Sequence, residues 1–201
     1  MKILFGTTTH GFKTYHYFAR EILKKIPESK FSIAFGPKIA VDFFDLQKKI
    51  KYVNFASEEF NYLTNKVNMD EIKNFEKIYK NKSIWRIISA DRQYGRSFTH
   101  DSIYFTKKYK DKYTDEEILS YCSFVIKKTK NILQKFQPDF FISPIGVGGI
   151  EVGIMEIMMK ANNVKFLVPS TTRVKNFFAF SDNTQLLFPN IDKKYLEYLK
   201  K

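Results

Sequence analysis

Short apolar runs alternate with amphipathic segments over the first part of the chain. Three of these runs lack the polar alternation of a half-exposed strand, which is typical of strands buried on both faces: residues 2–8, 31–35 and 52–56. Between the first two runs, apolar residues recur at intervals of three and four and predict an amphipathic helix: Tyr15, Phe18, Ile22 and Ile26. Residues 39–50 predict a second, short helix. This order of strand, helix, strand, helix and strand predicts a parallel sheet.

The middle of the chain has a less regular pattern. Residues 68–81 show helical spacing, whereas residues 83–92 fit a helix or a strand equally well. We expect an irregular insert over about 83–113. A long helix is predicted after Thr114, because a capping hydroxyl followed by three acids favours a helix start. Apolar residues then recur every three or four positions as far as Phe136.

The last third of the chain returns to the strand and helix pattern of the first. Residues 140–145 and 165–170 predict two more buried strands. Between them, residues 150–161 are apolar almost all round, which is typical of a helix buried against a sheet. Residues 171–180 are expected to continue as a loop or an edge strand.

Together these elements predict an α/β fold, with a Rossmann-like, doubly wound, mainly parallel sheet and helices on both faces. We expect one domain over residues 1–190, followed by a C-terminal helix or linker over 191–201. A hydrophobic content of 44% excludes wholesale disorder. The single cysteine, Cys122, excludes a disulfide scaffold, and its place on an apolar helical stripe predicts a buried, inert thiol.

The net charge and the kind of basic residue limit the classes of partner that this protein could bind. The chain has 34 basic and 21 acidic residues, a net charge of +13, and only five of the basic residues are arginine. Such charge favours nucleic acid, an anionic membrane surface or a phosphorylated small molecule, or else marks a solvated lysine surface. Nucleic acid is the least favoured partner, because arginine recognises phosphates and bases better than lysine. The lysines are densest over 107–112, between tyrosines.

The location of the protein is predicted from what the sequence lacks. No stretch approaches the ~18 consecutive apolar residues of a membrane span. The N-terminus has too short an apolar run for a signal peptide and reads as a first strand. We expect a cytoplasmic protein, with peripheral binding at the inner face of the membrane as the alternative location.

Two glycine-bearing loops are expected at the carboxyl ends of strands, where ligands bind in parallel sheets. The first spans residues 6–11 (GTTTHG) and the second residues 146–149 (GVGG). Glycine lets a ligand approach the backbone, and the free amides of a following helix attract anions. Neither loop has the spacing of a dinucleotide fingerprint or a P-loop. The alternative is that these glycines only allow tight turns.

Four side chains are candidates for chemistry, two of them in or beside these loops. His10 is the acid/base candidate, because imidazole titrates near neutral pH and can take a proton from a hydroxyl; a structural histidine is the alternative. Glu151 is expected to bind a hydroxyl or cation, or to cap its own helix. Asp91 and Arg92, near Arg86, Arg96 and Trp85, predict either a local ion pair or a phosphate or sugar site. No metal site and no bound cofactor are expected.

The order of these motifs resembles the N-terminal half of GT-B-type glycosyltransferase-like proteins of bacterial capsule and surface-polysaccharide biosynthesis. The resemblance covers most of the chain and rests on these motifs: the strand at 2–5 with Thr9-His10-Gly11-Phe12, Trp85-Arg86 with Ala90-Asp91-Arg92, Pro138 to Ile142, Gly146-x-Gly148-Gly149-x-Glu151, and Thr172-Arg173. In that family the second domain binds most of the nucleotide-sugar donor, and the N-terminal domain shapes the acceptor side. This sequence has one domain's worth of residues, and we therefore expect little or no catalysis by this chain alone.

The resemblance implies a role for each matching residue. His10 is the expected catalytic base. The expected substrate-binding residues are Thr9, Gly11, Gly146, Gly148, Gly149, Glu151, Asp91, Arg92 and Arg173. The expected partners are a sugar or polysaccharide acceptor and a second GT-B-like domain or subunit, with a nucleotide sugar as donor. Two other functions stay open: a non-catalytic nucleotide- or sugar-binding module, and a basic protein that binds nucleic acid or a membrane surface.

Overall fold

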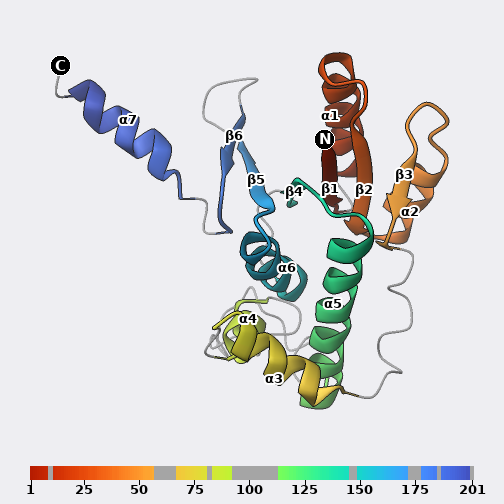
Figure 1. Ribbon diagram of the computed structural model, residues 1–201, viewed down its shortest axis with the longest axis vertical. Coiled ribbons are helices and arrows are strands. Elements are labelled where there is room, and N and C mark those ends of the chain that lie inside the picture. Colours follow the sequence, from red (N-terminus) through yellow and green to blue (C-terminus); the bar gives the residue numbers. More distant parts are fainter. Residues whose placement is uncertain are drawn as a thin grey trace, which may run out of the picture.

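Six strands form one sheet in the computed structural model of the protein (Figure 1). The structure describes residues 1–8, 11–56, 67–80, 83–91, 113–144, 149–171, 178–184 and 187–199. The strands are β1 (Lys2–Gly6), β2 (Lys30–Phe35), β3 (Tyr52–Asn54), β4 (Phe140–Ile142), β5 (Lys165–Thr171) and β6 (Phe178–Ser181). They are arranged in the order β3-β2-β1-β4-β5-β6. The first five run parallel, and β6 pairs antiparallel with β5 at the edge.

Helices cover both faces of this sheet, because alternate residues of each buried strand point to opposite sides. On one face Ile3 and Phe5 of β1 pack with α1 (Phe12–Lys25) and α2 (Lys38–Asp45). On the other face Leu4 packs in the cluster formed by α5 (Asp115–Lys135) and α6 (Ile150–Ala161). The fold is therefore α/β and doubly wound, with a Rossmann-like, mainly parallel sheet, as the sequence pattern predicts.

A third apolar cluster lies beyond the sheet and holds the remaining helices of the body. It joins α3 (Met69–Ile78) and α4 (Trp85–Ala90) to the inward faces of α5 and α6. In Figure 1, α3 and α4 lie together at the lower end of α5. Residues 83–92, which fit either structure, thus contain a short helix. Most of the predicted insert over about 83–113 lies outside the described residues.

The start of α5 forms as its sequence predicts. The Thr114 hydroxyl accepts a hydrogen bond from the backbone N–H of Glu117 at 3.2 Å, and the Glu117 carboxylate accepts one from the backbone N–H of Thr114 at 2.7 Å. Both bonds satisfy amides that lack partners inside the helix. Cys122 of α5 is fully buried in the third cluster, which confirms the prediction of a buried thiol.

Helix α7 (Pro189–Leu199) projects from the body of the molecule (Figure 1). Every residue from Ile191 to Leu199 is exposed. The stretch predicted as a helix or linker is thus helical over most of its length. Among the described helices, none is both long and apolar enough to cross a membrane.

The position of the third cluster yields a prediction of stability. Ile154 of α6 is 0% exposed in this cluster, whereas Ile78 at the end of α3 is 62% exposed. Ile154→Ala leaves a cavity in packed surroundings and is expected to lower the free energy of unfolding by about 2–5 kcal/mol. The matched control Ile78→Ala is expected to change it by about 0.5 kcal/mol or less. Urea denaturation followed by circular dichroism measures both, and equal losses would contradict the assigned core.

Candidate functional site

The strand order changes direction between β1 and β4. From β1 the chain proceeds to β2 and β3 on one side, and β4 and β5 lie on the other. The connections after β1 and β4 therefore diverge at the carboxyl edge of the sheet. Ligands of open parallel sheets bind at such a topological switch point. The chain segments that follow β1 and β4, on which the two glycine loops were predicted, leave the sheet at this point.

The strand ends beneath the switch point are tightly packed. Thr7, just after β1, donates through both its backbone N–H and its hydroxyl to the carbonyl of Phe35 at the end of β2, each at 3.0 Å. A Cβ at Gly6 would lie 2.5 Å from the Phe35 ring and 3.0 Å from Pro144, after β4. Glycine at position 6 is thus required by the close approach of three chain segments. These contacts fix the direction in which the first loop leaves the sheet.

Helix α1 begins beside the end of β4. Gly11 occupies its N-cap position, and the Tyr15 hydroxyl donates to the carbonyl of Ser143 at 2.9 Å. This bond ties the first turn of α1 to the residue that follows β4. No acidic residue lies in the first turn of α1, and Lys13 does. The positive end of the α1 dipole is therefore not balanced by a carboxylate of its own first turn.

Helix α6 begins in the opposite electrostatic setting. Asp91, which follows α4, accepts a hydrogen bond at 2.8 Å from the backbone N–H of Ile150. A Cβ on Gly149 would lie 2.9 Å from the same carboxylate oxygen, so only glycine leaves room for this contact. Glu151 places a second carboxylate in the first turn of α6. The first amide of α6 is thus already bonded to a carboxylate of the chain, which opposes the binding of an anion there.

Asp91 makes a contact that neither interpretation of the sequence included. A local ion pair and a phosphate or sugar site were the alternatives, and the structure adds a bond to a helix start 59 residues further along the chain. Asp91 thereby links the end of α4 to the start of α6. Periodicity has no signal for such a contact, because it joins residues far apart in the sequence.

The structure places only some of the predicted site residues. Gly11 caps α1, Gly149 caps α6, and Glu151 and Asp91 flank the start of α6. The other predicted site residues lie outside the described part of the chain: Thr9, His10, Arg92, Gly146, Gly148 and Arg173. The prediction that both glycine loops line a single cleft therefore stays a prediction.

Other polar groups in the described chain have structural roles. The His16 Nδ1 lies 2.8 Å from the Tyr52 hydroxyl, at the boundary of α1 and β3. Burial, and then the positive charge of Arg20, lower the pKa of His16, while burial raises the pKa of Tyr52. Within the described residues, no three metal-ligating side chains gather into a cluster.

Sequence reasoning missed a second polar region, on α5. Polar residues recur there at helical spacing on the side opposite the apolar stripe: Ser120, Ser123, Lys127, Asn131 and Gln134. They line a cavity of about 780 Å³ between α5 and the start of α3. The spacing was visible in the sequence, but it is also typical of a solvated helix face. Only the tertiary structure distinguishes the two.

The bond between Asp91 and α6 is expected to contribute to stability. Asp91→Ala should lower the free energy of unfolding by about 0.5–2 kcal/mol, since the helix start loses its cap. Asp42→Ala, at an exposed position within α2, is the matched control and should have little effect. Gly149→Ala should also lower the free energy of unfolding, because its Cβ meets the Asp91 carboxylate. The double variant, with both substitutions, should lose less free energy of unfolding than the two single variants combined. Thermal and urea unfolding measure these losses, and strictly additive losses would contradict the contact.

The Cys122 thiol is expected to be unreactive in the folded protein. Burial, with the nearby negative charge of Asp91 as a smaller cause, raises the pKa of Cys122 to about 12. Because the thiolate is the reactive form, its population at pH 8 is negligible. Ellman's reagent should therefore label the native protein far more slowly than the protein unfolded in guanidinium. Rapid labelling under native conditions, at the rate of a free thiol, would refute the assigned burial.

Comparisons with known proteins leave the function to be inferred from the molecule. A scan against protein-family models gave no match, and searches of the curated proteins and of the solved structures gave none either. The resemblance to GT-B-type glycosyltransferases thus rests on the sequence motifs alone. The doubly wound fold and the charges at the switch point are the structural facts from which a function can be proposed.

Proposed function

We propose that this chain is the acceptor-side domain of a GT-B-like glycosyltransferase of surface-polysaccharide biosynthesis. In this proposal it acts with a second, donor-binding domain or subunit. The observation that carries the proposal is the carboxylate of Asp91 on the first amide of α6. A donor diphosphate needs free amides, basic side chains or a metal to balance its charge. At the start of α6 it would meet two carboxylates instead, those of Asp91 and Glu151.

Carboxylates at a switch point suit an uncharged, hydroxyl-rich ligand. A sugar hydroxyl donates to a carboxylate oxygen and forms a charge-assisted hydrogen bond, which is stronger than a neutral one. Asp91 and Glu151 both lie at the start of α6, the helix that follows β4 in the chain. This distribution of charge favours the acceptor sugar over the nucleotide diphosphate as the ligand at the start of α6.

The proposed role of His10 follows from its place in the chain. It lies between Thr8, after β1, and Gly11, the N-cap of α1. As general base it would take the proton of the acceptor hydroxyl while the new glycosidic bond forms. The bond from the donor sugar to phosphate breaks in the same step, and the nucleoside diphosphate leaves with the bonding electrons.

Helix α7 supports the need for a partner. Its exposed apolar side chains are Ile191, Tyr195, Leu196, Tyr198 and Leu199, and they range from 54% to 75% exposed. An isolated helix of 11 residues is marginal in water, and residues 191–199 of α7 are all exposed. A second domain or subunit that covers these side chains would stabilise the helix. It would also close the switch point against water, which glycosyl transfer requires to avoid hydrolysis.

The proposal predicts binding without turnover by the isolated chain. N-acetylglucosamine and its UDP derivative serve as probes, with the product followed by mass spectrometry and the binding by backbone amide NMR. We expect weak binding of the free sugar, with shifts at the amides of Gly11, Ser143 and Ile150, and little or no transfer. His10→Ala should weaken this binding. His16→Ala, which removes the histidine bonded to Tyr52, is the matched control and should leave it unchanged.

Two outcomes would contradict the proposal. Robust transfer by the chain alone would show that no second domain is required. Sugar binding that leaves the amides of Gly11, Ser143 and Ile150 unshifted would place the acceptor elsewhere. Equal binding by His10→Ala and the unchanged protein, at the expected place, would favour a non-catalytic sugar-binding module.

A further inference from the structure

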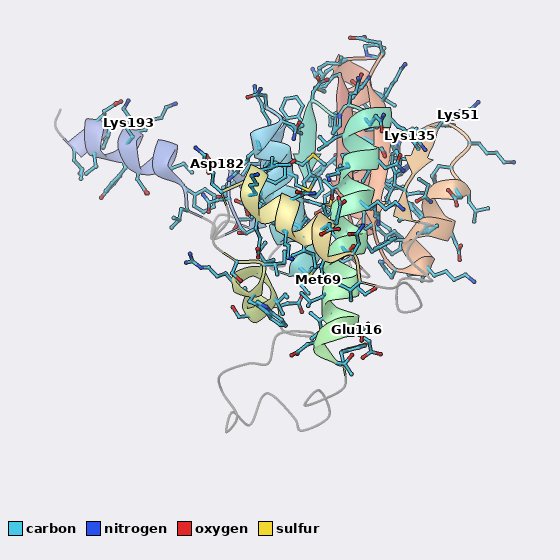
Figure 2. All side chains as sticks on the ribbon, turned by 60° about the horizontal axis from the view of Figure 1, so that its bottom comes forward. Lys51, Met69, Glu116, Lys135, Asp182 and Lys193 are labelled. Atoms are coloured by element: carbon cyan, nitrogen blue, oxygen red, sulfur yellow. The ribbon has the colours of Figure 1, made fainter. Side chains whose placement is uncertain are left out.

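The outer face of α5 borders a cavity whose side chains are mostly polar. The cavity has a volume of about 780 Å³ and lies between this face and the start of α3. Figure 2 shows Met69, the first residue of α3, beside α5 between its labelled residues Glu116 and Lys135. The volume falls within the ~300–1,000 Å³ typical of small-molecule sites. The cavity is therefore large enough for a ligand the size of a nucleotide.

Burial distinguishes this face from an ordinary solvated helix surface. Ser120, Ser123 and Lys128 are buried, and Lys128 is only 5% exposed. Lysine is among the residues that are least often buried, because its ammonium group loses hydration. The Lys128 ammonium lies 5.7 Å from the centre of the Phe124 ring, which also lines the cavity. This contact places a positive charge at the cavity wall instead of in bulk water.

Positive charge prevails in the described lining of the cavity. Three lysines and one glutamate give a net charge of +2: Lys127, Lys128, Lys130 and Glu71. The single carboxylate is already bound, because Glu71 Oε1 lies 2.6 Å from Lys130 Nζ. The Asn68 side-chain oxygen likewise accepts a hydrogen bond from the backbone N–H of Glu71 at 3.1 Å, at the N-terminus of α3.

Hydrogen-bond donors add to this charge. Asn131 and Gln134 line the cavity with carboxamide groups, and Ser120 and Ser123 with hydroxyls. Each carboxamide has two donor hydrogens and each ammonium has three. These groups end flexible side chains, so their donors can turn toward a ligand. Ligands with several negatively charged oxygens match such a lining, because charge-assisted hydrogen bonds are the strongest available in a protein.

We propose that this cavity is a binding site for a phosphate-bearing small molecule, a nucleotide or a sugar phosphate. Lys127 binds the phosphate oxygens, and Asn131 and Gln134 bind polar groups of the remainder. The site is separate from the switch point, since its described lining comes from α3, its N-cap residue and α5 alone. Its net charge is also opposite to that at the start of α6, where the carboxylates of Asp91 and Glu151 lie. The inference therefore stands whether or not the chain is a glycosyltransferase domain.

The test titrates the full chain with pyrophosphate, UDP, glucose 1-phosphate and glucose. Isothermal titration calorimetry gives the affinities, and amide NMR locates the binding. We expect the three phosphate compounds to bind and shift the amides of residues 120–134, and glucose to leave those amides unchanged. Tighter binding of UDP than of pyrophosphate would identify a nucleotide site, whereas tighter binding of glucose 1-phosphate would identify a sugar-phosphate site.

Variants on one helix separate a built site from general attraction to a basic protein. Lys127→Ala removes an exposed cavity lysine and should weaken phosphate binding roughly tenfold or more. Asn131→Ala should weaken it less. Lys135→Ala, an exposed lysine at the end of α5 outside the cavity lining, is the matched control and should leave the affinity unchanged. Circular dichroism confirms that each variant folds.

Three outcomes would overturn the proposal. These are no phosphate binding at millimolar concentration, equal weakening by Lys127→Ala and Lys135→Ala, and shifts at Gly11 and Ile150 in place of those on α5. The last outcome would place an anion at the switch point and would count against the proposed acceptor site as well. If phosphate compounds fail to bind at α5 and do not bind at the switch point either, the acceptor proposal is unaffected. Failure of the phosphate site and failure of the acceptor site are therefore distinguishable.

Discussion

Burial of a parallel sheet on both faces is the constraint on which this molecule depends. Ile3 and Phe5 of β1 point to one side and Leu4 to the other, and each side must be covered by helices. Because parallel strands need long crossovers, the helices also return the chain to the same end of the sheet each time. The carboxyl ends of β1 and β4 thereby become neighbours. The candidate site thus arises because the helices that cover the sheet bring these two strand ends together.

Local pattern predicted most of the described elements of this fold. Periodicity predicts the buried strands and amphipathic helices. The start of α5 is predicted by Thr114 and Glu117, which lie three residues apart. The contact of Asp91 with Ile150 has no such signal, since it depends on how α4 packs against α6. The short α4 was ambiguous because six residues span fewer than two helical turns.

The sequence places two glycine-bearing segments after buried strands, and those strands, β1 and β4, are neighbours in the sheet. It does not specify the chemistry of the helix starts that follow them. Whether a helix start there accepts an anion depends on its neighbours in space, and at α6 the neighbour is a carboxylate. The polar face of α5 posed the converse problem: its spacing resembles that of a solvated face, and the burial of Ser120, Ser123 and Lys128 distinguishes it from one. The charge that surrounds a helix start and the burial of a side chain both depend on tertiary contacts, and a single sequence does not specify them.

The short outer strands bear on how this protein behaves at high concentration. The sheet ends at β3, which has three residues, and at β6, which has four and runs against its neighbour. An edge strand presents unpaired backbone groups to any other chain, and its capacity to template a foreign strand grows with its length. Such short edges offer few groups for continued pairing. The sheet architecture thereby limits edge-to-edge aggregation, even though its interior strands are strongly apolar.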